Sequence, residues 1–184
     1  MKVLTFLTER FETVEALAVI DILRRADIEV KLISVSDNKY VESAQNIIVQ
    51  ADAAMNDISG CDKEDVLFLP GGPGHKLYYE CDKLMDMLVK HNDNVGRIAA
   101  ICAAPSVLGR LGILKGKKAT CFPGFEDMLE GARIEPADVR VVTDGNVTTS
   151  RGMGTSIDMG LELVRLIAGD EKADELARST QYRL

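Results

Sequence analysis

Cys102 is the residue whose surroundings point most clearly to chemistry. The apolar run Arg97–Ile101 predicts a buried strand that ends at this cysteine, and Pro105 suits the first turn of a following helix. A cysteine at such a turn is placed like the serine of a nucleophile elbow. The positive end of the helix dipole would lower the pKa of the thiol toward the reactive thiolate. Alternatively, Cys102 is a buried small apolar residue, and placement alone does not decide between the two.

Glu15 stands in the helical segment Val14–Leu23, where the only other acid is Asp21. A carboxyl in such an apolar run is expected to be desolvated, which raises its pKa and favours the neutral acid. A neutral carboxyl can donate a hydrogen bond to a thiolate or exchange a proton with substrate. The alternative for Glu15 is a first-turn residue favoured by the helix dipole. Asp21 is interpreted as the i, i+4 partner of Arg25.

Two glycine-rich turns follow predicted strands. Pro70–Gly74 could present backbone N–H groups as an oxyanion hole, and His75 after it is a possible accessory group rather than an expected base. Ser150–Ser156 does not fit a dinucleotide-binding turn, because position 157 is isoleucine and the turn lies late in the chain. Simple chain reversal is the alternative for both turns.

The remaining cysteines and histidines form no metal-binding pattern. Cys61, Cys81 and Cys121 have irregular spacing without a C-x-x-C pair, and His91 is expected on the surface near a helix end. We therefore expect free thiols in a reducing cytosol, no metal site and no required cofactor.

Composition limits the classes of protein that this chain can represent. The 184 residues are 46% hydrophobic and carry a net charge of -7. One domain spanning residues 1–184 is expected. The acidic balance argues against nucleic acid or anionic lipid as the main partner. No apolar run approaches the roughly 20 residues of a membrane span, and the N-terminus does not resemble a signal peptide, so a cytoplasmic protein is predicted.

Apolar strand-like runs alternate with helical patterns, which predicts an α/β fold with a mostly parallel sheet. The predicted strands are Lys2–Leu7, Glu29–Val35, Val66–Leu69 and Arg97–Ile101, with one or two short strands in Val41–Ala51 and a hairpin of Val139–Thr143 and Asn146–Ser150. The predicted helices are Thr13–Ala26, Lys76–His91, a short one ending at Leu111, Thr155–Ala168 and Glu171–Ala177. Thr155 and Asp158 are expected to form a capping-box-like arrangement.

Together, four ordered motifs make nearly the whole chain resemble the DJ-one/ThiJ/PfpI superfamily, most closely its DJ-one and bacterial ThiJ-like branch. The segments that carry the resemblance are Phe11–Glu15 with Asp21–Ala26, Leu69–Gly72, Ala99–Pro105 and Thr149–Ser156. The resemblance implies a flavodoxin-like, class I glutamine amidotransferase-like sandwich with helices on both faces of the sheet. It also implies a homodimer.

The resemblance implies a role for each matching residue. Cys102 matches the reactive cysteine, and Glu15 matches the acid that hydrogen-bonds it. The Gly71–Gly72 turn and Ala103 match the positions whose backbone N–H groups bind the oxyanion or substrate. Arg151 and the pair Asp21 and Arg25 match positions near the dimer interface, and Arg151 is also a possible accessory group at the site.

Two positions depart from relatives. Phe122, a possible accessory residue at the site, stands before Pro123 where animal DJ-one proteins carry a histidine. This departure argues against efficient glyoxalase chemistry, which benefits from a second proton-transfer group. Ala103 follows the cysteine where PfpI-type peptidases have a histidine, which argues against a Cys–His protease.

The resemblance implies a cysteine-dependent stress-response protein of the deglycase or glyoxalase-like type. Its substrates would be small reactive aldehydes and dicarbonyls, or their glycated adducts, with Cys102 as nucleophile and Glu15 as proton-transfer partner. The alternative is a non-enzymatic redox sensor or chaperone-like protein that acts through oxidation of Cys102. The same residues serve both functions, so the sequence does not separate them.

Overall fold

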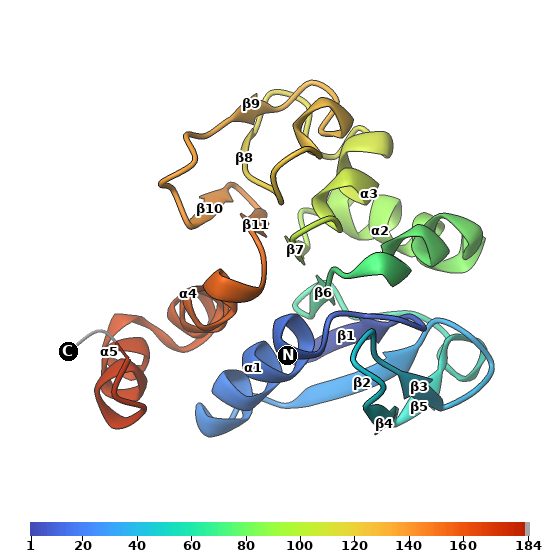
Figure 1. Cartoon of the computed structure of the whole chain (residues 1–184), viewed down its shortest axis with the longest axis horizontal. Coiled ribbons are helices and arrows are strands. Elements are labelled where there is room, and N and C mark those ends of the chain that lie inside the picture. Colours follow the sequence, from blue (N-terminus) through green and yellow to red (C-terminus); the bar gives the residue numbers. More distant parts are fainter. Residues whose placement is uncertain (183–184) are drawn as a thin grey trace.

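The computed structural model describes residues 1–182 and contains a seven-stranded sheet between two layers of helices (Figure 1). The strand order is β10-β11-β7-β6-β1-β2-β5, and the pairs are parallel except for the β10–β11 hairpin. The strands are β1 Val3–Leu7, β2 Val30–Ser34, β5 Ala53–Ala54, β6 Val66–Leu69, β7 Arg97–Ile101, β10 Val141–Asp144 and β11 Val147–Ser150. This arrangement confirms the predicted α/β fold.

Helices cover both faces of the sheet, as Figure 1 shows. One layer holds α1 Thr13–Arg25, α4 Ser156–Ala168 and α5 Asp170–Ser179, and the other holds α2 Asp82–Asp93 and α3 Pro105–Arg110. Alternate residues of β1 enter opposite layers: Val3 and Leu7 join the first core, whereas Leu4 and Phe6 join the second. Burial on both faces explains why the central strands are continuous apolar runs.

The predicted helix Lys76–His91 is wrong at its beginning. The chain instead forms a 3-10 segment, η2 Pro73–Glu80, and then leaves helical geometry at Cys81 before α2 begins. The Tyr78 hydroxyl lies 2.9 Å from the carbonyl oxygens of both Phe6 and Pro70. These buried contacts fix the 3-10 segment against the sheet, and helical spacing in the sequence does not reveal them.

Short elements flank the main sheet. The strands expected in Val41–Ala51 are confirmed as an antiparallel hairpin of β3 Tyr40–Glu42 and β4 Ile48–Gln50. The pair β8 Lys118–Ala119 and β9 Arg133–Ile134 was not predicted, because strands of two residues are too short to show an alternation of apolar and polar residues. Short 3-10 turns complete the fold: η1 Met55–Asp57, η3 Glu126–Met128 and η4 Met153–Thr155. Within residues 1–182, no helix is long and apolar enough to cross a bilayer.

Candidate active site

Cys102 lies where β7 ends, at the carboxyl edge of the sheet. Its backbone is in the left-handed region with φ of 64°, which is unfavourable for a cysteine by roughly 1–3 kcal/mol. Two hydrogen bonds hold this conformation: the Cys102 N–H donates to Ser150 O at 2.9 Å, and the Phe122 N–H donates to Cys102 O at 2.8 Å. The predicted sharp strand-to-helix turn is therefore confirmed, and the Cys102 side chain is partly exposed.

Glu15 is buried in the first turn of α1, with 1% of its surface exposed. The helix begins there because the Glu12 carboxylate accepts a hydrogen bond from the Glu15 N–H at 2.7 Å, as an N-cap side chain does. The Glu15 carboxylate in turn accepts a hydrogen bond from the Gly71 N–H at 3.0 Å. The carboxyl is thus fixed between α1 and the turn that follows β6.

Glu15 and Cys102 meet through a hydrogen bond between their side chains. Burial raises the pKa of Glu15 to about 7, and the charge of Glu12 adds to this effect. The hydrogen bond to Cys102 and the N–H groups of Gly71 and Met153 act in the opposite direction. The sequence-based expectation of a desolvated carboxyl with a raised pKa is confirmed.

The expectation of a thiol with a lowered pKa is wrong. Burial, followed by the charge and hydrogen bond of Glu15, raises the pKa of Cys102 to about 12. The N–H groups of Gly72 and Ala103 favour the thiolate but do not outweigh these effects. Burial thus favours the protonated carboxyl of Glu15, and burial together with Glu15 favours the protonated thiol of Cys102. A carboxylate with a pKa near 7 is then placed to accept the thiol proton.

The raised pKa of Glu15 predicts a pH-dependent stability. Between the ordinary value of 4.5 and about 7, the folded carboxyl keeps a proton that the unfolded chain has released. The resulting stabilisation is fully present below about pH 4.5 and is lost as the pH rises through 7, by on the order of 3 kcal/mol. In urea unfolding, the stability of Glu15→Gln relative to wild type should therefore increase from pH 4 to pH 8. If the difference in free energy of unfolding between Glu15→Gln and wild type does not change with pH, the raised pKa of Glu15 is contradicted.

Gly71 leaves room for the pair of side chains. A Cβ atom at this position would lie 2.5 Å from Glu15 Oε2 and 2.6 Å from Cys102 Cβ, closer than such atoms approach. The neighbouring Gly72 has φ of 99°. Both glycines are therefore required by contact or conformation at the turn after β6.

Gly71→Ala should lower the free energy of unfolding by about 1–3 kcal/mol, because the added methyl group forces Glu15 and Cys102 apart. The variant should also lose part of the pH-dependent stability that Glu15 confers. Gly154→Ala is the matched control, since a Cβ there meets no atom within 4 Å. Chemical denaturation at pH 5 and pH 8 tests this, and equal stability of the two variants would contradict it.

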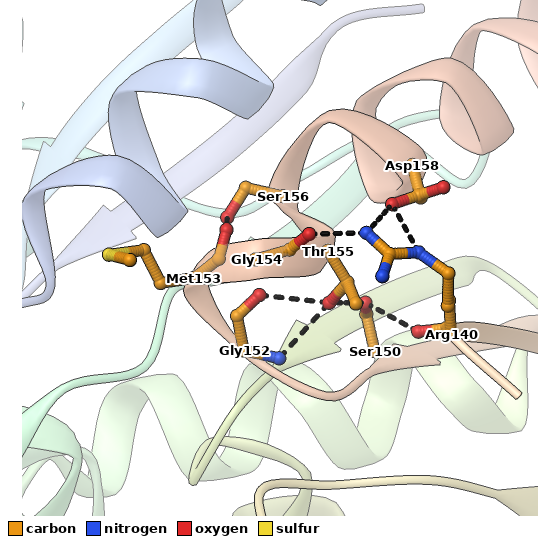
Figure 2. Close-up of polar contacts among 8 residues, drawn as sticks. All are labelled: Arg140, Ser150, Gly152, Met153, Gly154, Thr155, Ser156 and Asp158. Atoms are coloured by element: carbon orange, nitrogen blue, oxygen red, sulfur yellow. Dashed lines mark hydrogen bonds and ion pairs between the residues drawn. The ribbon is translucent and has the colours of Figure 1, made fainter. Parts of the chain in front are cut away.

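The turn between β11 and α4 lies beside the Glu15 carboxyl. A network of polar contacts holds this turn (Figure 2). Arg140 pairs with Asp158 through Nε at 2.9 Å and Nη2 at 2.7 Å, and Nη2 also donates to Gly154 O. Ser150 Oγ donates to Arg140 O at 2.9 Å. This network fixes the backbone next to Met153, whose N–H faces the Glu15 carboxylate.

The capping-box-like arrangement expected for Thr155 and Asp158 is wrong. Thr155 Oγ1 donates to Gly152 O at 2.8 Å and accepts from Gly152 N at 3.1 Å, so it closes the η4 turn (Figure 2). Asp158 binds Arg140 instead. A partner 18 residues away in sequence competes for the carboxylate, and spacing along a helix does not reveal such a partner.

A surface hollow of about 480 Å³ lies beside this turn. Its walls include Phe122, Arg151, Gly152 and Met153, and Phe122 is 47% exposed. A Cβ on Gly152 would be 3.2 Å from the Phe122 ring and 3.6 Å from Glu15 Oε1, so the hollow approaches the carboxyl. Phe122 and Arg151 thus line a hollow beside the turn that covers Glu15, whereas neither Glu15 nor Cys102 is among the residues that line this hollow.

The other predicted residues lie apart from the thiol. His75 is buried, its Nδ1 is 2.9 Å from Gly72 O, and its ring packs edge-on against Phe125. Burial lowers the pKa of His75. The His75 side chain therefore stabilises the turn after β6 and is not placed to act on the Cys102 sulfur. Asp21 and Arg25 form the expected i, i+4 ion pair at 2.7 Å on the exposed side of α1.

Three contributors were not predicted from the sequence. Glu12 caps α1 and raises the pKa of Glu15, and an acid just before a helical pattern could have indicated the cap. The Met153 N–H and the Arg140 contacts depend on the fold, because β10, β11 and α4 bring them together. Among residues 1–182, no group of three or more histidine, cysteine or acidic side chains is placed to hold a metal ion.

Comparison with known proteins gives consistent matches. The model of the DJ-1/PfpI family matches residues 1–166. "Protein DJ-1 homolog A" of Arabidopsis thaliana is 40% identical over 90% of this chain, which spans about two fifths of that relative's length (43%). "Glutathione-independent glyoxalase DJR-1.2" of Caenorhabditis elegans is 31% identical over 92% of this chain and 90% of its own. The structure of "Toxoplasma gondii DJ-1, oxidized" has a TM-score of 0.89 at 33% identity and covers 100% of this chain and 99% of its own.

Proposed function

The chain belongs to the DJ-1/PfpI family, and we propose on that premise that it converts small reactive dicarbonyls, or their adducts, to hydroxy acids. The observation that carries the proposal is the hydrogen bond between a partly exposed thiol and a buried carboxyl whose pKa is near 7. A similar protein named as a glutathione-independent glyoxalase supports the reaction class. Cys102 is the proposed nucleophile and Glu15 the proposed proton-transfer group.

The first step is addition of the thiol to an aldehyde such as methylglyoxal. Cys102 Sγ bonds to the aldehyde carbon while its proton moves to the Glu15 carboxylate, which the hydrogen bond between them makes direct. The carbonyl oxygen becomes an oxyanion. The N–H groups of Gly72 and Ala103, which already favour negative charge on the sulfur, are the proposed donors to that oxyanion.

The second step is rearrangement of the hemithioacetal. Glu15 returns its proton to the oxyanion and, as a carboxylate again, removes the hydrogen from the former aldehyde carbon. A proton is then added to the neighbouring carbon, while the hydroxyl proton on the first carbon's oxygen moves to the oxygen of the second, which gives a thioester of a hydroxy acid. Water then hydrolyses the thioester and releases the acid and the Cys102 thiol. A base with a pKa near the working pH suits both proton transfers. Neither step requires a cofactor.

The hollow beside Glu15 is the proposed route for substrate. Arg151 is partly exposed on its wall and supplies a positive charge suited to the carbonyl oxygens of a dicarbonyl or to the carboxylate product. Phe122 provides an apolar surface where a histidine would offer a second proton-transfer group. We therefore assign all proton transfers to Glu15.

The reaction type is tested by incubating the protein with methylglyoxal in deuterium oxide and analysing the lactate. We expect lactate to form with deuterium on its hydroxyl-bearing carbon, because the hydrogen passes through a carboxyl that exchanges with solvent. Mass spectrometry and proton NMR measure the label. Lactate formation no faster than without protein would overturn the proposed activity, and an unchanged rate in Glu15→Gln would overturn the role of Glu15.

A second function, redox sensing, is favoured by the donors around the sulfur. A sulfinate on Cys102 would carry negative charge next to the N–H groups of Gly72 and Ala103, and neutral Glu15 could donate to it. One of the similar structures is described as oxidised. Peroxide titration followed by peptide mass analysis separates this function. Oxygen uptake at Cys81 before Cys102 would contradict it.

The homodimer and the cytoplasmic location stay proposals. For the dimer, we propose that the outer face of α1 forms the contact, where Val14 is 42% exposed and Asp21 and Arg25 border a hollow of about 260 Å³. Sedimentation of the full chain tests this interface: wild type should sediment as a dimer and Asp21→Lys as a monomer, because the substitution replaces the Asp21–Arg25 ion pair on this face with two like charges. A dimer that persists unchanged in Asp21→Lys would contradict this interface.

A further inference from the structure

A second cysteine, Cys61, lies beside a histidine at the opposite end of the sheet from Cys102. Cys61 Sγ is 3.5 Å from His91 Nδ1, and His91 Nε2 is 3.0 Å from the carbonyl oxygen of Asp65. Asp65 directly precedes β6, whereas Cys102 directly follows β7. The two strands are parallel and the five residues of β7 span roughly 16 Å, so the two thiols belong to separate sites.

The hydrogen bonds of His91 fix its tautomer. A carbonyl oxygen can only accept, so Nε2 carries the hydrogen, and Nδ1 of the neutral ring is left to accept the Cys61 thiol proton. The expected surface position of His91 is wrong, because the residue is only 4% exposed. Burial lowers the pKa of His91, which favours this neutral form. A Cβ on Gly96 would overlap the ring, so the imidazole packs directly on that backbone. A thiol, a base and a group that orients the base are thus in place.

The thiol borders a cavity of about 360 Å³ with a positive rim. Lys63, Lys83 and Lys90 line it against one acid, Asp86, in a chain whose net charge is -7. Lys83 Nζ is held by the carbonyl oxygens of Met55 at 2.9 Å and Ile58 at 2.7 Å. The volume is in the range of small-molecule sites, and the three lysines favour a negatively charged ligand.

Two further acids face the sulfur and affect its reactivity. Asp62 and Asp65, together with burial, raise the pKa of Cys61, while Lys2 lowers it. Lys2 pairs with Asp65 at 2.8 Å and with Asp62 at 3.4 Å. The resting sulfur is therefore a protonated thiol, and its reaction depends on His91 as a base.

From this arrangement we propose that Cys61 is a modification site that exchanges with small anionic disulfides, with His91 as its base and Lys63 and Lys90 as the groups that attract the disulfide. His91 Nδ1 takes the thiol proton as Cys61 Sγ attacks one sulfur of the disulfide. The new S–S bond forms as the old one breaks, and the leaving thiolate receives the proton from His91. One disulfide is consumed and one is formed, so no further oxidant is needed.

The probes for this proposal are glutathione disulfide, which is anionic, and cystamine, which is a cationic disulfide. Peptide mass analysis of the full chain gives the rate of mixed-disulfide formation at each cysteine. With glutathione disulfide, Cys61 should react at least about tenfold faster than Cys81, which is also partly exposed but has no base beside it among the described contacts. Equal rates at the two cysteines would overturn the proposal.

Two variants test the two roles. The double variant Lys63→Gln/Lys90→Gln changes exposed side chains and should slow glutathione disulfide about fivefold while leaving cystamine no slower. His91→Gln should slow mixed-disulfide formation at Cys61 about tenfold or more with both probes. If the lysines alone promoted the reaction, loss of the histidine would not slow the cationic probe. If circular dichroism shows that His91→Gln does not fold, the lysine variant decides alone. An equal effect of the double variant on both probes would overturn the anionic specificity.

Discussion

Cys102→Ser is expected to lower kcat/KM for methylglyoxal by at least about 10³-fold, which corresponds to roughly 4 kcal/mol of lost transition-state stabilisation. Serine preserves the shape of the side chain at the end of β7 and can still contact Glu15. Its hydroxyl, however, is far more basic once ionised than a thiolate, and Glu15 with a pKa near 7 cannot deprotonate it effectively. Lactate formation under initial-rate conditions measures the loss.

The matched control for this prediction is Cys81→Ser. Cys81 is also partly exposed but lies between η2 and α2, away from Glu15, so its replacement should leave the rate unchanged. Equal rates for wild type and Cys102→Ser would eliminate Cys102 as the nucleophile. A wild-type protein that forms no lactate but gains oxygen at Cys102 under peroxide would favour the sensor function instead.

The fold was predictable because its signals are local. The strands β1, β6 and β7 are short, mostly apolar runs, and burial on both faces makes such runs easy to recognise. Cys102 and Glu15 were also identifiable, because each breaks the pattern of its own element: one ends a buried strand, and the other is an acid in an apolar helix.

The electrostatics of the site were less predictable than its position. The position of Cys102 before α3 suggested a thiol stabilised as a thiolate, yet the pKa of Cys102 is raised by burial and by Glu15. That result depends on the contact between α1 and the end of β7, which are more than 80 residues apart in the sequence. The Arg140–Asp158 contact and the Cys61–His91 pair are likewise products of tertiary structure that no spacing in the sequence reports.

Glu15→Gln is expected to lower kcat/KM for methylglyoxal by about 10²–10⁴-fold, the usual range for removal of a general base. Glutamine can still accept a hydrogen bond from the Gly71 N–H, but it cannot take the thiol proton or move a proton between carbons. In wild type, kcat/KM should rise with pH up to about 7 and then level, because the carboxylate is the active form and the pKa of Glu15 is about 7. The Gln variant should lack this rise.

The neighbouring acid provides a control that distinguishes a base from a nearby charge. The charge of Glu12 raises the pKa of Glu15, so Glu12→Gln should move the rise in kcat/KM to lower pH while keeping the maximum rate close to that of wild type. A glutamine side-chain oxygen at position 12 can still accept from the Glu15 N–H, so the helix start is preserved. If the rise near pH 7 persists in Glu15→Gln, another group titrates there. The carboxyl would then only position the thiol, and its raised pKa would be a consequence of burial without a part in the chemistry.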